Sequence, residues 1–193
     1  MTDLILASAS PRRAEILRQI GVAFQIVPAD IDETPMSQEL PTDYVRRMAR
    51  EKTQHVIDSI AGSSTVVLGA DTSVVLGCKI YGKPKNQDEG MSMLADLSGK
   101  THQVLTAVAM GNKQSCVLKL SATDVKFRDL DPEECLKYWK TGEPLDKAGG
   151  YAIQGMGAVF IEKISGSFSG VVGLPIEQTS QLLQTFNVPI WDL

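Results

Sequence analysis

Residues 8 to 13 read Ser-Ala-Ser-Pro-Arg-Arg, so a serine hydroxyl and two guanidinium groups meet at the predicted start of a helix. Ser10 is a natural N-cap and the proline after it suits the first helical position, which places Arg12 and Arg13 in the first turn. Cations are unfavourable there, because the N-terminal end of a helix carries partial positive charge. We therefore expect a phosphate group to bind at Ser8, the two arginines and the free backbone N–H groups. The alternative is an ordinary capped helix whose arginines reach solvent or pair with acidic residues elsewhere.

Another cation, Lys52, lies on the apolar face of a long predicted helix. The apolar residues of this face recur at helical spacing and are Val45, Met48, Ala49, Val56 and Ile60. Lys52 fills the gap in that series, so its ammonium must either extend to solvent or meet a negative partner. The neighbouring arginines, Arg46, Arg47 and Arg50, are predicted to form a solvated basic face.

Two carboxylates are candidates for a metal site. Asp71 follows an apolar strand, and carboxylates placed just beyond strand ends gather at the ligand sites of α/β sheets. Glu33 lies in an acidic loop that ends at Pro35. Together they would supply an oxygen-only site for Mg²⁺ or Mn²⁺. The alternatives are a structural aspartate that caps a turn and a loop glutamate that is simply solvated.

Lys83 completes the set of candidates, because Pro84 fixes the backbone beside it; the alternative is a plain surface lysine. Four cations, two carboxylates and a helix N-terminus with a serine suit metal-assisted phosphoryl or nucleotidyl transfer, which needs positioning and charge neutralisation more than a protein nucleophile.

The chain has no Walker-type phosphate loop and no complete dinucleotide-binding glycine motif. Two histidines and three widely spaced cysteines disfavour a zinc site and a disulfide framework.

Composition bounds the class of protein. The 193 residues are 43% hydrophobic and 22% charged, which predicts one ordinary globular domain over residues 1–193. The net charge of -4 disfavours stable binding to nucleic acid. Asp3 and the shortness of the first apolar run disfavour a signal peptide or a membrane segment, so we expect a cytoplasmic protein.

The periodicity alternates between strand and helix but includes hairpins, which predicts an α/β or α+β fold with a mixed sheet. Strands are expected over residues 4–7, 24–27, 65–70, 73–76, 79–81, 102–110, 115–126 and, in a glycine-rich form, 151–164. Helices are expected over residues 11–20, 42–60, 86–97, 132–140 and 175–186. Thr42 is the expected cap of the second helix and Gly62 lies beyond its end, while Gly111 and Asn112 predict a tight hairpin.

These residues resemble the motifs of the Maf family of nucleoside triphosphate pyrophosphatases, and the resemblance covers nearly the whole chain. Eight ordered blocks carry it, which is far more specific than any single motif. The blocks are residues 8–13 (SASPRR), 32–34 (DET), 49–52 (AREK), 69–72 (GADT), 82–84 (GKP), 145–149 (LDKAG), 153–155 (IQG) and 172–175 (VGLP).

The resemblance implies a two-lobed α/β fold of the Maf and ITPase type, with a strongly twisted mixed sheet and a nucleotide cleft between the lobes. It also implies a homodimer and a hydrolase, dependent on a divalent metal, that cuts a nucleoside triphosphate between its α and β phosphates. The products are the monophosphate and pyrophosphate, and the role is house-cleaning of the nucleotide pool. Asp71 would then orient or deprotonate the attacking water and share the metal with Glu33, as expected of a carboxylate in a chain without a usable histidine base.

Three positions distinguish the family members that cleave dTTP and UTP from those that act on 7-methyl-GTP. Arg12, Thr72 and Gln154 match the dTTP/UTP group here, and Thr72 and Gln154 are expected to contact the base edge. Gly170 departs from the pattern, because the family more often has asparagine there. Two alternatives stay open: a nucleotide-responsive regulator of septum formation, and a pyrophosphatase for modified nucleotides such as 7-methyl-GTP.

Overall fold

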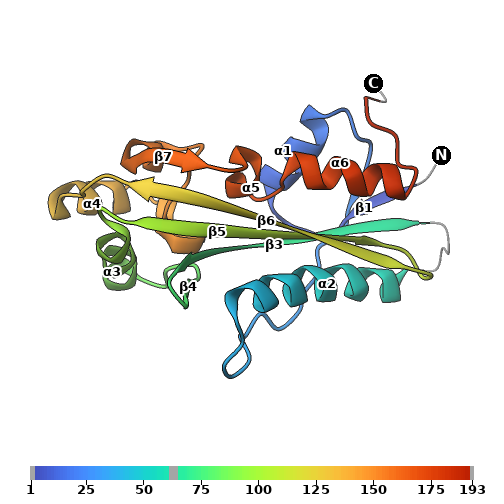
Figure 1. Ribbon diagram of the computed structural model, residues 1–193, viewed down its shortest axis with the longest axis horizontal. Coiled ribbons are helices and arrows are strands. Elements are labelled where there is room, and N and C mark those ends of the chain that lie inside the picture. Colours follow the sequence, from blue (N-terminus) through green and yellow to red (C-terminus); the bar gives the residue numbers. More distant parts are fainter. Residues whose placement is uncertain (1–2, 61–64, 192–193) are drawn as a thin grey trace.

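Three long strands run along the molecule, and the other elements are arranged around them (Figure 1). They are β3 (Val66–Leu76), β5 (Thr101–Gly111) and β6 (Cys116–Phe127) of a computed structural model that describes residues 3–60 and 65–191. The turn between β5 and β6 is closed by Asn112, whose side-chain Oδ1 accepts hydrogen bonds from two backbone N–H groups that follow it. The predicted hairpin is therefore confirmed.

The sheet is mixed. Its strands follow the order β2-β1-β3-β5-β6-β7, and β4 (Lys79–Tyr81) pairs with β3 beside this path. β1 (Leu4–Leu6) is parallel to β2 (Gln25–Ile26) and to β3, whereas the remaining pairs, including β6 with β7 (Ile161–Ser165), are antiparallel. The long strands cross one another in Figure 1, because the sheet is strongly twisted. The predicted fold class is confirmed.

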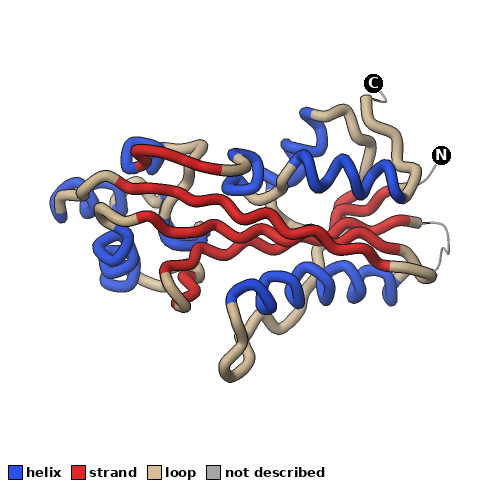
Figure 2. Tube along the Cα trace, in the orientation of Figure 1, coloured by secondary structure: helices blue, strands red, loops and turns tan. Residues whose placement is uncertain are grey.

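Helices cover both faces of the sheet (Figure 2). They are α1 (Pro11–Gln19), α2 (Pro41–Ser59), α3 (Gln87–Leu97), α4 (Pro132–Trp139), α5 (Phe168–Val172) and α6 (Ile176–Thr185), with 3-10 turns η1 (Glu143–Asp146), η2 (Ala148–Gly150) and η3 (Met156–Phe160). Helix α2 lies along one face, and α1, α5 and α6 lie on the opposite face. Within residues 3–60 and 65–191, no helix is both long enough and apolar enough to cross a membrane.

Two main apolar cores divide the molecule into two lobes. The first lobe packs α1 and α6 on the sheet through residues that include Leu17, Leu68 and Leu182. The second lobe packs α3 and α4 around Leu94 and Phe127. Because β3 and β5 contribute side chains to both cores, the same strands link the two lobes.

Several predicted boundaries were wrong. Helix α2 begins at Pro41 with Leu40 as its N-cap, so Thr42 does not cap it, and Gly62 lies outside the described residues. Residues 151–164 do not form one strand, because η3 precedes the short strand β7. Helix α5 was not expected; Ser167 caps it by accepting a hydrogen bond from the backbone N–H of Gly170 at 3.0 Å.

Candidate active site

The candidate residues gather at a gap in the sheet. Strand β1 pairs with β3 only over Val66 to Leu68, and β4 pairs with it only over Val74 to Leu76. Between these two stretches, the edge of β3 that carries Asp71 has no strand partner among the described residues. Asp71 therefore does not follow the end of its own strand, as predicted, but lies within β3 where the neighbouring strand β1 has ended. It does not cap a turn either.

Two clusters of predicted site residues, one on each face of the sheet, lie beside this gap. Side chains alternate across a strand, so Asp71 faces helix α2 and Thr72 faces the side of α1 and α5. Gly69, two residues before Asp71, lies against α2: a Cβ atom there would be 2.4 Å from Thr53 Oγ1 and 2.9 Å from the carbonyl oxygen of Ala49. This close approach brings the helix that carries Lys52 against the strand that carries Asp71.

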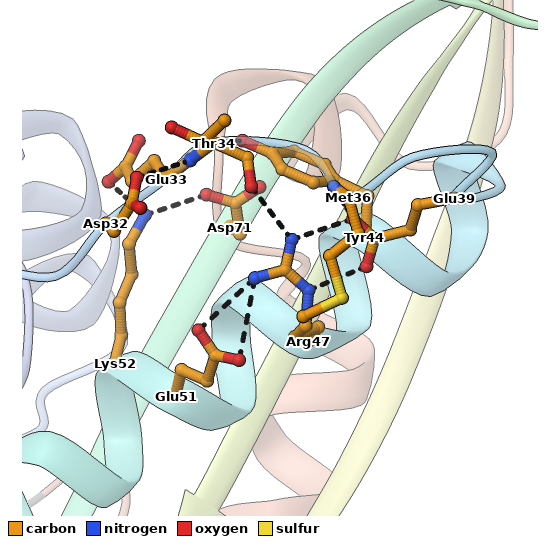
Figure 3. Close-up of polar contacts among 10 residues, drawn as sticks. All are labelled: Asp32, Glu33, Thr34, Met36, Glu39, Tyr44, Arg47, Glu51, Lys52 and Asp71. Atoms are coloured by element: carbon orange, nitrogen blue, oxygen red, sulfur yellow. Dashed lines mark hydrogen bonds and ion pairs between the residues drawn. The ribbon is translucent and has the colours of Figure 1, made fainter.

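Lys52 bridges the two predicted metal ligands (Figure 3). Its Nζ is 2.7 Å from Glu33 Oε1 and 2.8 Å from Asp71 Oδ1. The Lys52 and Asp71 side chains are buried, whereas that of Glu33 is 52% exposed. Of the two outcomes expected for Lys52, the structure has the ion pair. Partial burial raises the pKa of Glu33, but the hydrogen bond and charge of Lys52 outweigh burial and hold that pKa below its ordinary value.

Arg13 organises the second cluster. Its guanidinium donates hydrogen bonds to Ser8 Oγ at 3.1 Å, to Thr72 Oγ1 at 3.2 Å and to the carbonyl oxygen of Gly173 at 2.9 Å. Burial lowers the pKa of Arg13, and the charge of Asp71 opposes that shift, so the two clusters interact electrostatically. Ser10 stands at the N-cap as predicted, but its side chain makes no capping hydrogen bond.

The other predicted residues lie around these clusters. Arg12 Nη1 is 3.9 Å from Asp146 Oδ2 of η1, so Arg12 forms a long ion pair with an acidic residue of another segment. Lys83 is exposed, and its charge contributes to the lowered pKa of Glu33. Gln154 is exposed, and among the described residues its side chain makes no hydrogen bond to the clusters. The structure thus brings together Ser8, Arg13, Thr72, Lys52, Asp71 and Glu33 and leaves the other three at the periphery.

Gln154 lies in a segment that is held on both sides. Before it, the Tyr151 hydroxyl is 2.8 Å from Nε2 of the buried His102. After it, the Glu143 carboxylate accepts hydrogen bonds from the backbone N–H groups of Met156 at 2.8 Å and Gly157 at 2.9 Å. Sequence reasoning missed His102 and Glu143, because no local pattern links them to Gln154.

Arg47 was also missed. It does not belong to a solvated basic face, because its Nε and Nη2 donate to the two carboxylate oxygens of Glu39 at 2.6 and 2.7 Å (Figure 3). Arg46 and Arg50 are exposed, as predicted. The available signal was the recurrence of Tyr44, Arg47 and Glu51 on one side of α2, which indicates a shared face but not its partner.

Comparison with known proteins identifies the family of this chain. The family model for Maf-like protein matches residues 3–186, so the chain belongs to the Maf family. Three relatives are each named dTTP/UTP pyrophosphatase. The protein of Saccharophagus degradans is 47% identical over 98% of this chain and 91% of its own length. The protein of Alcanivorax borkumensis is 50% identical over 98% of both chains. The protein of Methylobacillus flagellatus is 48% identical over 98% of this chain and 96% of its own length.

Proposed function

We propose that this protein hydrolyses dTTP and UTP to the corresponding monophosphate and pyrophosphate. Membership of the Maf family and the names of its relatives support the reaction. The observation that carries the proposal is that Glu33 and Asp71 both contact the Lys52 ammonium, close to the Arg13 cluster. Such a site neutralises a polyphosphate and keeps a carboxylate next to it, as anhydride hydrolysis requires.

The donor set fits Mg²⁺ or Mn²⁺. Glu33 and Asp71 both contact the Lys52 Nζ, so the two carboxylates lie close together, and both ions prefer oxygen ligands. The described residues hold no group of three or more His, Cys, Asp or Glu side chains around a common point, so phosphate oxygens and water would complete the shell. When bound, the ion would neutralise phosphate charge next to these carboxylates.

Asp71 is proposed to orient and deprotonate the attacking water. Its carboxylate is buried at the gap, and Lys52 contacts Oδ1, which leaves Oδ2 to accept a proton. No histidine competes for this role, because His102 is buried in the second lobe and His55 is exposed on α2. Positioning of the water by this carboxylate would contribute to the rate enhancement.

The cations are proposed to bind the triphosphate. Arg13 offers a planar fork of N–H donors, which matches phosphate geometry, and Ser8 with the first-turn amides of α1 adds uncharged donors. Lys52 and Lys83 bring positive charge close to Glu33, and Arg12 lies beside Arg13 in the first turn of α1. As pyrophosphate leaves, these groups stabilise the charge that develops on it.

Thr72 and Gln154 are proposed to read the base edge. Thr72 Oγ1 lies beside Arg13 and also 3.0 Å from Thr106 Oγ1, so its position is fixed. Gln154 offers both an amide donor and a carbonyl acceptor, as the edge of uracil or thymine requires. Arg12, Thr72 and Gln154 together are proposed to favour dTTP and UTP over 7-methyl-GTP.

The test is release of pyrophosphate from dTTP, UTP, CTP, GTP, ATP and 7-methyl-GTP with Mg²⁺ or Mn²⁺. We expect preferential release from dTTP and UTP, and Asp71→Asn should lower kcat by at least about 1,000-fold while nucleotide affinity changes little. The matched control is Asp124→Asn, an exposed carboxylate on β6.

Each other outcome has a distinct meaning. Preference for 7-methyl-GTP would keep the chemistry and refute the base-reading residues. Substantial activity in Asp71→Asn would refute the role of Asp71. No release from any nucleotide would refute the enzyme and favour a regulator that binds nucleotides.

A further inference from the structure

The segment that carries Glu33 has no regular structure of its own. Residues 27–40 connect β2 to α2 without a helix or strand. Connections of this length are uncommon in folded domains and are often functional. The Glu33 side chain is 52% exposed, and ion pairs of exposed carboxylates contribute little to order. Other contacts must therefore fix Glu33 in place.

Arg47 makes the principal contacts to this segment. Besides its paired hydrogen bonds to Glu39, its Nη2 donates to the carbonyl oxygen of Thr34 at 3.2 Å, directly after Glu33. Glu39 Oε2 in turn accepts from the backbone N–H of Met36 at 3.0 Å. Glu51, one turn further along α2, lies 3.3 Å from Arg47 Nη1 and steadies the guanidinium from the opposite side.

Arg47 and Glu39 form a largely buried ion pair. The hydrogen bond from Arg47 lowers the pKa of Glu39 to about 2, so Glu39 stays ionised at neutral pH. The Arg47 side chain is 18% exposed and that of Glu39 is 9% exposed, in contrast to Glu33. Arginine suits this place because its planar fork contacts both carboxylate oxygens and a backbone carbonyl at once, which a lysine ammonium cannot reproduce.

A second contact from the same helix reaches Glu33 itself. The Tyr44 hydroxyl donates a hydrogen bond to the carbonyl oxygen of Glu33 at 2.9 Å. Tyr44 and Arg47 therefore hold two consecutive carbonyl groups, those of Glu33 and Thr34, on helix α2 (Figure 3). The same helix carries Lys52, so one rigid element fixes both partners of the ion pair.

We infer that Arg47 is a positioning residue for the candidate active site. Through Glu39 and the Thr34 carbonyl it holds the 32–39 segment on α2, so that the Glu33 carboxylate meets Lys52 and Asp71. This inference deepens the proposed function and relies on it for the kinetic test alone. Arg47 does not contact the reacting groups; it acts through Glu33, and small displacements of such groups are costly for catalysis.

Hydrogen–deuterium exchange tests the anchoring without reference to activity. In Arg47→Ala, amides of residues 32–40 should exchange at least about tenfold faster, because the segment loses its anchor to α2. Arg46→Ala and Arg50→Ala, exposed arginines on the same helix, are the matched controls and should leave this exchange unchanged. Equal exchange in Arg47→Ala and the controls would overturn the inference.

Kinetics with dTTP or UTP test the consequence for the site. Arg47→Ala should lower kcat by about 10- to 100-fold and change KM by less than about threefold, because Arg47 contacts none of the cations proposed to bind the triphosphate. A similar loss in KM and kcat, or a loss no larger than in Arg46→Ala, would contradict a positioning role.

Conservative variants keep the test valid if Arg47→Ala folds poorly. Glu39→Gln retains the shape of the partner and should reproduce the fall in kcat. The double variant Glu39→Gln with Arg47→Lys should have a kcat no lower than that of the less active single variant, since both substitutions break the same Arg47–Glu39 pair. Full activity in Arg47→Lys would show that charge alone suffices and would overturn the inference.

The two proposals fail separately. If the unaltered chain releases no pyrophosphate while Arg47→Ala still frees residues 32–40, the proposed function is wrong and the anchoring stands. If the unaltered chain is active and Arg47→Ala matches Arg46→Ala in both exchange and kcat, the inference is wrong and the function stands.

Discussion

Two buried ionisable side chains, Lys52 and His102, owe their different roles to their partners. Lys52 is flanked by the carboxylates of Glu33 and Asp71, so its buried ammonium has ion-pair partners at the gap. His102 is surrounded by aromatic rings, with Phe127 and Tyr151 packed edge-on, and its Nδ1 has no hydrogen-bond partner. A proton on both ring nitrogens would leave a buried donor unpaired, so the neutral form is favoured.

His102 should make stability depend on pH. Burial lowers its pKa from 6.5 to about 4, so between these values the unfolded chain binds a proton that the folded chain does not. The contribution of His102 is complete above about pH 6.5, and the free energy of unfolding should lose about 3 kcal/mol from this residue as the pH falls to about 4. Urea unfolding across this range measures the slope.

His102→Gln retains a partner for the Tyr151 hydroxyl but does not titrate. We expect it to flatten this part of the pH dependence, whereas the exposed His55→Gln should not. Parallel curves for His102→Gln and the unaltered chain would contradict the assignment.

At the scale of elements, the contact between α2 and β3 sets the distance between Lys52 and Asp71. Gly69 allows it, because a Cβ atom at this position would overlap the backbone of α2 as well as Thr53 Oγ1. Thr53 Oγ1 donates hydrogen bonds to the carbonyl oxygens of Ala49 at 2.8 Å and Ala109 at 3.2 Å, so these bonds would break if the hydroxyl moved. The helix would have to shift instead.

Gly69→Ala should therefore lower the free energy of unfolding by about 1 to 3 kcal/mol. It should also lower kcat by about tenfold or more, since Lys52 and Asp71 lie on the two elements that are forced apart. Gly82→Ala is the control for stability, because a Cβ atom there meets nothing within 4 Å, and it should change stability by less than about 0.5 kcal/mol. Denaturant unfolding and pyrophosphate release measure the two effects. Wild-type stability in Gly69→Ala would contradict this view of the contact.

At the scale of the whole molecule, the lobes have separate cores but share their long strands. Side chains of β3 and β5 pack in both cores, so neither lobe can lose its sheet without affecting the other. We propose from this that the chain unfolds as one cooperative domain. The homodimer implied by the resemblance and the cytoplasmic location predicted from the N-terminal residues stay predictions, and light scattering on the purified protein tests the first.

Cooperativity has a direct test. Trp139 packs on Gly90 in the second lobe, so its fluorescence reports on that lobe when Trp191 is replaced by phenylalanine. Leu182→Ala in the first lobe and Leu94→Ala in the second should each lower the free energy of unfolding by about 2 to 5 kcal/mol, and both should shift the Trp139 transition. If Leu182→Ala leaves the Trp139 transition in place, the lobes unfold independently and the single-domain proposal is wrong.

The sequence by itself determined the local structure and the chemical inventory of this protein. Apolar periodicity predicted α2 and α6 to within about two residues, and Asn112 predicted the hairpin, because these features depend on neighbours along the chain. The ordered motifs identified the family. The position of Lys52 on an apolar stripe also required a negative partner or an extension to solvent, although it did not say which.

Only the tertiary structure decided where these groups meet. Arg13 reaches Thr72, and Lys52 reaches Asp71, across segments that are distant in the sequence. The gap beside Asp71 exists because β1 ends before β4 begins along the same edge of β3, which no local pattern reveals. Arg47 looked like its exposed neighbours until the fold placed Glu39 beside it. The physical reason is that a side chain's partner depends on how packed elements cross, whereas its propensity depends on the residues next to it.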